Sequence, residues 1–177
     1  PQSVTFTPDD WDTAQIVTVR GVDDDEDDGD IDFMIQTASA ISGDANYDGL
    51  VADDVAVTNV DDDTAGITVT ANFGDTSEAG DAVTFSIVLD SRPTADVTID
   101  VSSTDVTEGS VSPETILFTP DTWDTAQIVS VLGVDDDVDD GDIGYTVVIA
   151  AADSDDSNYD EIDSDDIPLI NRDDDEA

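Results

Sequence analysis

The chain has 177 residues, of which 47 are acidic and only three, all arginines, are basic, so its formal net charge is −44. This charge excludes nucleic acids and anionic membranes as partners, because both are bound through basic patches. The absence of cysteine and histidine excludes disulfides and removes the commonest transition-metal ligand. Hydrophobic residues still make up 38% of the chain, more than is typical of disordered acidic segments, and a folded protein is predicted.

The first third of the chain recurs near its end. Residues 6–25, FTPDDWDTAQIVTVRGVDDD, match residues 118–137, FTPDTWDTAQIVSVLGVDDD, and 37 of the first 65 residues are identical to those 112 positions further on. A period of this length indicates whole domains in tandem and not a solenoid of small units. We therefore predict a truncated repeat over residues 1–66, without a counterpart of residues 67–112, and a complete repeat over residues 67–177. No stretch is typical of a signal peptide or membrane span. The chain starts at Pro1 with strand-like sequence and no initiator methionine, and it is interpreted as an excerpt of a longer one.

One strand of the truncated repeat shows which of its faces packs inward. Val17 and Val19 recur unchanged as Val129 and Val131, whereas the intervening Thr18 and Arg20 become Ser130 and Leu132. One face is kept and the other varies, as expected when only one face of a strand contacts the core. Trp11 and Trp123, each after a TPD turn or its equivalent, are predicted to be core anchors.

Apolar and polar residues alternate through the complete repeat. One segment has apolar residues at every second position: Val83, Phe85, Ile87 and Leu89. Polar residues separate them as far as Ser86, and residues 97–101 repeat the alternation. A period of two with many β-branched residues predicts strands. Further strands are predicted at residues 67–72, 115–119, 127–134, 143–151 and 166–172, and no segment has a helical period over ten residues. About seven short strands in about 110 residues predict an all-β fold, an immunoglobulin-like antiparallel β-sandwich.

The acidic residues gather where the predicted strands end. Aspartate accounts for 41 of them and glutamate for 6, and they cluster at residues 23–30, 44–54, 61–63, 135–142, 153–166 and 173–175. Calcium takes six to eight oxygen ligands, which loops at one end of a sandwich can supply. Carboxylates around a divalent cation are coordinated where they would otherwise repel one another. Calcium sites are therefore predicted; the alternative is an acidic halophilic surface without specific sites.

A second constellation lies in DANYDG at residues 44–49. Asp44, Asn46, Asp48 and Gly49 match the first half of an EF-hand loop, but the twelfth position is Val55 instead of glutamate. An EF-hand is therefore excluded. Two interpretations stay open for this loop and its counterpart: a further calcium site or a simple Asx-rich turn. The candidate residues are Asp44, Asn46, Asp48, Asp156, Asn158 and Asp160.

Three segments together resemble bacterial relatives of the Calx-beta domain: TSEAGDAVTFSIVLDSRPTADVTIDVSS at 76–103, LFTPDTWDTAQIVSVLGVDDDVDDGD at 117–142, and the terminal DDD at 173–175. Such repeats occur in large surface adhesins and extracellular matrix proteins. The resemblance implies a calcium-binding sandwich with its ions at the end where the chain leaves. The ligands it implies are Glu78, Asp105, Asp135, Asp136, Asp140, Asp173, Asp174 and Asp175, and in the first copy Asp23, Asp24, Asp28, Asp61, Asp62 and Asp63.

No catalytic constellation is present, since the chain lacks histidine, cysteine, lysine, a phosphate loop and a nucleophile elbow. The leading hypothesis is a structural extender repeat of a secreted bacterial adhesin or cell-surface filament, made rigid by calcium and acting in adhesion or a biofilm matrix. Its expected partners are neighbouring repeats or subunits of the same protein, including a homopolymeric filament, without insertion into a membrane. The alternative is an extracellular domain that binds glycans or proteins.

Overall fold

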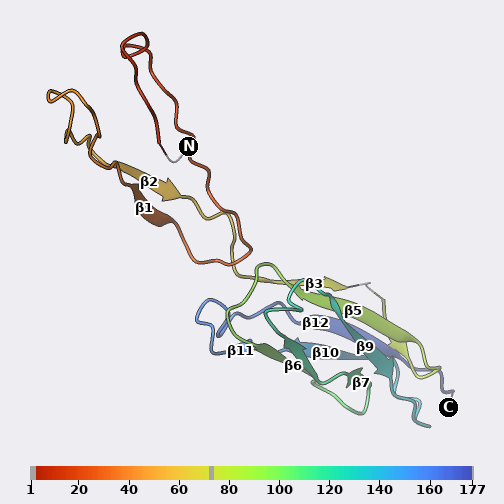
Figure 1. Ribbon diagram of the computed structural model, residues 1–177. Coiled ribbons are helices and arrows are strands. Elements are labelled where there is room, and N and C mark those ends of the chain that lie inside the picture. Colours follow the sequence, from red (N-terminus) through yellow and green to blue (C-terminus); the bar gives the residue numbers. More distant parts are fainter. Residues whose placement is uncertain (1–2, 72–73, 177) are drawn as a thin grey trace. The chain divides into compact units, whose positions relative to one another are not determined.

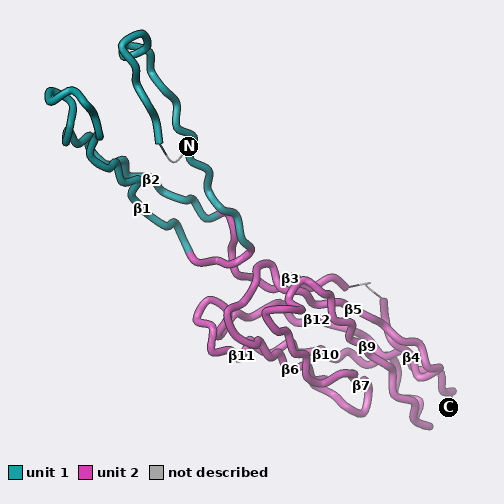
Figure 2. Tube along the Cα trace, in the orientation of Figure 1, with its two compact units in different colours: residues 1–24, 29–61 teal, residues 25–28, 62–177 magenta. Residues whose placement is uncertain are grey.

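The computed structural model describes residues 3–71 and 74–176 and divides the chain into two compact units. Unit 1 comprises residues 1–24 and 29–61, and unit 2 comprises residues 25–28 and 62–177 (Figure 2). Every regular element in the described residues is a strand, so this part of the chain holds no helix that could cross a membrane. The boundary between residues 66 and 67 was inferred from the period of the sequence repeat, and it stays a prediction.

Unit 2 is built from two sheets (Figure 1). The first has the order β3-β5-β9-β7, formed by β3 (Ile67–Ala71), β5 (Ala82–Leu89), β9 (Gln127–Gly133) and β7 (Gly109–Ser112). The second has the order β11-β6-β10-β12-β4, with β8 also paired to β6; its strands are β11 (Asp153–Ser154), β6 (Val97–Ser103), β10 (Ile143–Ile149), β12 (Ile167–Arg172), β4 (Thr76–Ser77) and β8 (Thr115–Phe118). All pairs are antiparallel except β4 with β12. The predicted all-β antiparallel sandwich is confirmed.

The core of unit 2 lies between these sheets and follows the alternation in the sequence. Inward residues of β5, β6, β9, β10 and β12 form one buried cluster. In β9, Val129 and Val131 are fully buried, whereas Ile128 on the opposite face is 58% exposed. The predicted inward face of this strand is confirmed. Trp123 packs against the same cluster, as expected of a core anchor.

The strand register brings several strand ends to one end of unit 2. Ala82 at the start of β5 pairs with Leu132, and Gly109 at the start of β7 pairs with Gly133. In the other sheet, Asn171 near the end of β12 pairs with both Ile143 and Thr76. The loops before β5, before β7 and after β9 therefore meet the C-terminal segment there, and we call this end of unit 2 the exit pole. Residue 67 begins β3 at the opposite end of the unit (Figure 1).

Unit 1 contains one strand pair, β1 (Ile31–Ile35) with β2 (Val55–Asn59). Phe33 pairs with Val57, which is the Tyr145–Leu169 pair of unit 2 shifted by 112 residues. The turn that follows β1 also recurs, since Ala40 N donates to Leu50 O at 2.7 Å and Ala152 N donates to Ile162 O at 2.8 Å. The repeat in the sequence is thus reproduced in local backbone structure.

Residues 3–6 and 15–21 correspond to β8 and β9 but are not in strands. In unit 2, β8 pairs with β6, and β9 pairs with β5 and β7. The described residues of unit 1 contain no counterpart of β5, β6 or β7, which residues 67–112 form in unit 2. The same local sequence therefore does not form strands when its pairing partners are missing.

We expect Ile87→Ala to lower the free energy of unfolding of unit 2 by about 2–5 kcal/mol, because Ile87 is fully buried in the core and truncation leaves a cavity. Ile128→Ala on the exposed face of β9 is the control, with an expected change within about 0.5 kcal/mol. Urea denaturation in calcium-containing buffer measures both. Equal losses in the two variants would contradict the observed division of inward and outward faces.

Candidate metal centre

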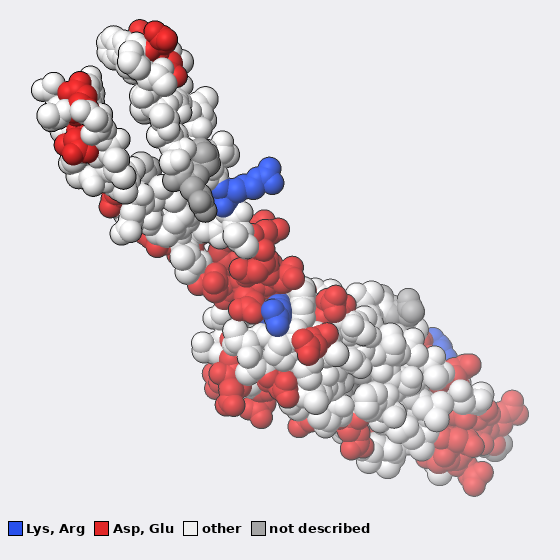
Figure 3. Space-filling view, viewed as in Figure 1, with Lys and Arg blue, Asp and Glu red and all other residues white. Residues whose placement is uncertain are grey.

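The exit pole is strongly acidic. The loops that meet there carry Glu78, residues 135–142 and residues 173–176. Figure 3 shows acidic side chains crowded at this end of unit 2. The only basic residue described close to them is Arg172, which forms ion pairs with Asp75 and, at 3.5 Å, with Asp142. One guanidinium at the edge of the cluster does not neutralise it.

Two overlapping groups of carboxylates converge at the pole. Oxygen atoms of Glu78, Asp135 and Asp174 lie within 4.8 Å of one another, and so do those of Glu78, Asp173 and Asp175. Glu78 belongs to both groups and is buried. It comes from the β4–β5 loop, whereas its neighbours come from the segments after β9 and β12. The site thus joins residues that are far apart in the sequence.

The electrostatics of the cluster disfavour its charged form. Burial raises the pKa of Glu78, and the charges of Asp173, Asp136 and Asp175 raise it further. Burial also raises the pKa of Asp175, again with added repulsion from Asp173 and other neighbouring carboxylates. The pKa of Asp173 is lowered, because its carboxylate accepts the backbone N–H groups of Asp175 at 2.9 Å and of Gly141 at 2.7 Å.

Two buried oxygen atoms near the cluster support a cation site. Within the described residues, Asp175 Oδ2 and Asn171 Oδ1 are buried and have no hydrogen-bond partner. Buried polar atoms are nearly always paired, so an orphaned acceptor needs an explanation. A hard divalent cation such as calcium, which takes only oxygen ligands, fits this donor set. The residues that would hold it are Glu78, Asp135, Asp173, Asp174 and Asp175.

Glycines shape the backbone segments and hydrogen bonds that hold these acids, which we call the frame. A Cβ atom on Gly133 would collide with Ser77 O and Asn171 Oδ1, so glycine is needed where β9 leaves the sheet. Gly141 has a φ of 78°, which L side chains rarely adopt, and there its N–H reaches Asp173. Between them, Asp136 Oδ1 accepts the Val138 N–H at 2.7 Å. The GVDDD motif and the following DDGD thus have a local structural role.

The remaining predicted ligands of the complete repeat lie outside the two groups. Asp105 caps its own loop: its Oδ1 accepts the Thr107 N–H at 3.0 Å and hydroxyl at 2.6 Å. These bonds lower the pKa of Asp105. Asp136 adds to the repulsion at Glu78, and the Asp140 N–H donates to Val138 O at 2.7 Å.

Two buried polar residues at the pole were not singled out from the sequence. Asn171 Nδ2 donates to Val134 O at 2.9 Å and to Glu108 Oε2 at 3.4 Å, and Asn171 and Glu108 are both buried. The signal for Asn171 was its place in the alternation, on the inward face of β12 with Ile167 and Leu169. Glu108 had no comparable signal.

The first copy reproduces part of this frame. Asp61 Oδ2 accepts the Gly29 N–H at 2.6 Å, and Asn59 Nδ2 donates to Val22 O at 2.9 Å. These bonds match those of Asp173 with Gly141 and of Asn171 with Val134. Of the other predicted ligands, Asp23 and Asp24 belong to unit 1, and Asp28, Asp62 and Asp63 belong to unit 2. The residues described in unit 1 contain no counterpart of Glu78, and no three of the six acids converge.

The second pair of candidate loops forms Asx turns. Asp44 Oδ1 accepts the Asn46 N–H at 2.9 Å, and Asp156 Oδ1 accepts the Asn158 N–H at 3.0 Å. The other oxygen of Asp156 accepts the Thr94 N–H at 2.7 Å. Backbone N–H groups thus bond to both carboxylate oxygens of Asp156. Among the described residues, no group of three acids converges at these loops. Asp48 and Asp160 accept the N–H groups of Ser42 and Ser154 in the same turns.

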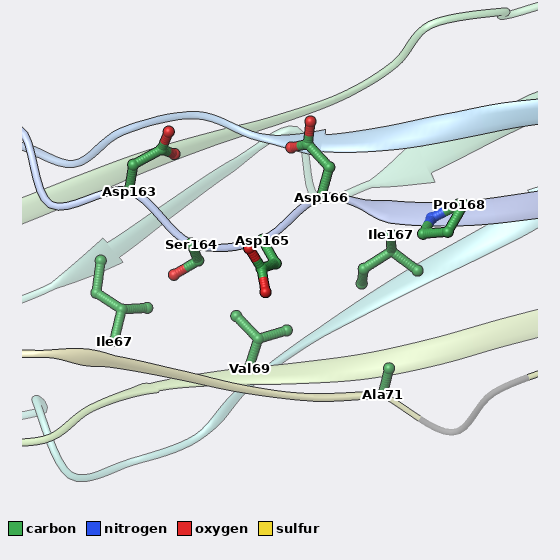
Figure 4. Close-up of a pocket in the computed structure, with 9 residues that line it drawn as sticks. All are labelled: Ile67, Val69, Ala71, Asp163, Ser164, Asp165, Asp166, Ile167 and Pro168. Atoms are coloured by element: carbon green, nitrogen blue, oxygen red, sulfur yellow. The ribbon is translucent and has the colours of Figure 1, made fainter.

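An open groove of about 570 Å³ runs between β3 and the segment before β12 (Figure 4). Apolar residues of β3 line one side of the groove, and the segment on the other side carries three aspartates, of which Asp165 points toward Val69 (Figure 4). The lining residues are Ile67, Val69, Ala71, Asp163, Ser164, Asp165, Asp166, Ile167 and Pro168. None of these nine described residues is aromatic, so none of them offers a platform on which a sugar ring could stack.

The fold is assigned from the strand pairing described above, and comparisons with known proteins add no argument to it. No protein family model and no curated protein matches the sequence. Solved structures that are similar include the apo form of the Calx CBD1 domain, with a TM-score of 0.42 and 17% identity over 62% of this chain and 98% of that one. Two others are the Caenorhabditis elegans proteins SSP-19, an MSP-domain-like protein (TM-score 0.38, 12% identity, 58% and 96% covered), and WR4, an MSP family member (TM-score 0.35, 13% identity, 60% and 95% covered). Similarities at this level say nothing about what the chain binds.

The raised pKa values predict a pH dependence. A carboxyl whose folded-state pKa is raised contributes stability below its unfolded pKa and loses it as pH rises through the folded value. In chelator, acidification from pH 7 towards the ordinary glutamate pKa of 4.5 should therefore raise the melting temperature of unit 2. The lowered pKa of Asp173 has the opposite effect on stability, but this effect begins only when the pH falls below the ordinary aspartate pKa of 3.8.

Glu78→Gln is the matched control, since it removes the buried carboxyl and keeps its shape. The rise on acidification should be smaller in this variant than in the parent chain. Thermal melts of both proteins across the pH range make the comparison. An identical pH dependence would show that Glu78 does not carry the effect.

Proposed function

We propose that this chain is a calcium-stabilised structural module, whose folded state includes calcium at the exit pole. The observation that supports this most directly is the shared position of Glu78 in two converging carboxylate groups, beside the orphaned Asp175 Oδ2. A surface that is acidic without specific sites would keep its carboxylates exposed, because burial of one carboxylate among several others penalises the charged form. A coordinated cation removes that penalty.

The proposed role in extension is supported by the positions at which the chain enters and leaves unit 2. Residue 67 begins β3 at one end and the chain leaves at the exit pole (Figure 1), so copies joined in tandem would extend and not fold back. Calcium bound by residues 173–175 would stiffen the chain as it leaves the sandwich. We infer that the parent protein is a secreted bacterial adhesin or a cell-surface filament, with neighbouring repeats or subunits as partners.

An extracellular setting suits such sites. Extracellular calcium modules commonly bind with dissociation constants of about 0.1–1 mM, matched to calcium levels outside cells. A net charge of −44 also keeps chains apart in solution. A role in catalysis has no support from the residue types, since the sequence contains no histidine, cysteine or lysine.

Two other functions make predictions that differ from this one. A ligand-binding domain would use the groove beside β3, but none of the described residues that line it is aromatic. A halophilic surface module would need high salt and no particular cation. The first predicts ligand-dependent stabilisation, and the second predicts that sodium substitutes for calcium.

Removing calcium should lower the melting temperature of unit 2 sharply. A site at a hundredfold excess of ligand over its dissociation constant contributes about 2.7 kcal/mol. Differential scanning calorimetry in calcium, in chelator, and in chelator with high sodium gives the comparison. If sodium restores stability as fully as calcium does, the halophilic interpretation is correct and the calcium proposal fails.

Individual carboxylates should matter unequally. Asp135→Asn and Glu78→Gln should each weaken calcium binding at least about tenfold, because each removes a charged oxygen ligand. Asp90→Asn and Asp100→Asn remove the same charge at exposed carboxylates that bond to Thr68 and Thr115, and should change affinity little. Isothermal titration calorimetry measures all four. Equal losses would mean a diffuse ion atmosphere without a coordinated site.

A further inference from the structure

The acidic turn at residues 25–28 belongs to unit 2, whereas residues 29–61 after it belong to unit 1. The turn has an internal bond, in which the Asp28 N–H donates to Glu26 O at 2.9 Å. The equivalent bond at residues 138–140 in the second copy measures 2.7 Å. The turn therefore has the same local form in both copies, so its shape comes from its own sequence.

The backbone of this turn accepts hydrogen bonds from two segments of unit 2. The Arg92 N–H donates to Asp25 O, and Asn158 Nδ2 donates to Asp27 O, each at 2.6 Å. The carboxylate of Asp27 is also bonded, since the Ala65 N–H donates to its Oδ2 at 2.8 Å. Donors from three separate segments thus converge on one turn. We call Ala65, Arg92 and Asn158 the turn-binding surface.

The position of Asn158 in this surface is set by a buried carboxylate. Asp156 is buried, and its two oxygens accept the Asn158 N–H at 3.0 Å and the Thr94 N–H at 2.7 Å. In unit 1 the equivalent Asn46 is held by the same kind of turn, but its Nδ2 donates back to Asp44 Oδ1 at 2.9 Å. The Asn158 amide instead reaches a partner outside its own loop.

Arg92 adds a contact that distinguishes the two acidic turns. Its Nη1 lies 3.4 Å from Glu26 Oε1, and its Nε donates to Pro120 O at 3.1 Å, which holds the guanidinium in place. The two turns, DDDEDDGD and DDDVDDGD, are identical except where the second has Val138 in place of Glu26. The chain has only three basic residues, and this one contacts the residue that differs.

We propose that the turn-binding surface recognises the acidic turn of an adjoining repeat, with the turn of the first copy as its occupant in this chain. Arg92 makes the surface prefer a turn with glutamate at the position of Glu26 to one with valine. The other donors bind either turn, because Asp139 is the counterpart of Asp27. The inference rests on the part of the proposed function in which neighbouring repeats are partners. It does not rest on calcium, since Asp25, Glu26 and Asp27 are not among the predicted calcium ligands.

Amide hydrogen exchange of Ala65 in the full chain measures occupancy of this surface, because its N–H is bonded to the turn. Glu26→Val gives the first turn the sequence of the second. It should speed this exchange about two- to fivefold, the range expected of one partly exposed ion pair. Amides of β5 and β9 are the internal control and should exchange at unchanged rates. Unchanged exchange at Ala65 in this variant would overturn the proposed preference.

Reversal of the two charges tests the ion pair directly. Arg92→Glu places a carboxylate against Glu26 and should speed exchange of Ala65 at least about tenfold, because like charges in contact repel. Arg92→Glu with Glu26→Arg restores opposite charges and should return the exchange to within about twofold of the parent chain. Equal exchange in the single and the double variant would contradict the proposal.

Asn158→Ala removes one bond to the backbone of the turn and keeps the N–H that bonds to Asp156. It should speed exchange of Ala65 about two- to tenfold, as expected for the loss of one hydrogen bond. Asn46→Ala is the matched control, since Asn46 Nδ2 bonds within its own loop, and it should leave Ala65 unchanged. Equal effects of the two substitutions would show that Asn158 does not bind the turn.

Measurements in calcium and in chelator, at a temperature at which unit 2 is folded in both, separate this inference from the calcium proposal. The melting temperature reports on the exit pole, whereas the ratio of Ala65 exchange between variant and parent chain reports on the turn-binding surface. Variant effects that persist in chelator support recognition of the turn, even if calcium fails to stabilise unit 2. Ala65 exchange that is the same in all variants in both buffers would overturn it, even if calcium stabilises unit 2.

Discussion

Repulsion between carboxylates that the fold holds together is the constraint on which the rest of unit 2 depends. The register of β4, β5, β9 and β12 fixes Glu78 beside Asp135 and the terminal triplet, so the acids cannot move apart without loss of strand pairing. Burial raises the pKa values of Glu78 and Asp175, and the neighbouring carboxylates raise them further. A bound cation would resolve this repulsion, and the folded state and the ligand would then be parts of one equilibrium.

The frame that carries these acids is partly local. The Gly141–Asp173 and Asn171–Val134 hydrogen bonds recur in unit 1 as Gly29–Asp61 and Asn59–Val22. They form in unit 1 although its described residues contain no counterpart of β4 or β5. Glu78, in contrast, is supplied by the β4–β5 loop, so only a complete sandwich brings the buried carboxylate to the frame. Metal binding of the kind proposed would therefore report on completion of the domain.

The two copies also separate local from non-local causes of strand formation. Residues 15–21 and β9 differ at only two of seven positions, yet β9 is a central strand and residues 15–21 are not in a strand. By comparison, β1 and β10 differ at most positions and both form strands, because each has an antiparallel partner in its own unit. Strand propensity describes how well a residue fits a pleated and partly buried surface, and here the presence of that surface decides the outcome.

The sequence by itself determined the alternation of β5, β6, β9 and β12, the absence of helical periodicity and the 112-residue repeat, because each of these is a pattern along the chain. It also located the acid clusters at strand ends. Only the tertiary structure decided which acids converge. Asp105 lies in a turn and bonds to Thr107, while Glu108 and Asn171 are buried at the pole. The physical reason is that convergence depends on strand order and register between segments tens of residues apart, and these follow from how the two sheets share one core.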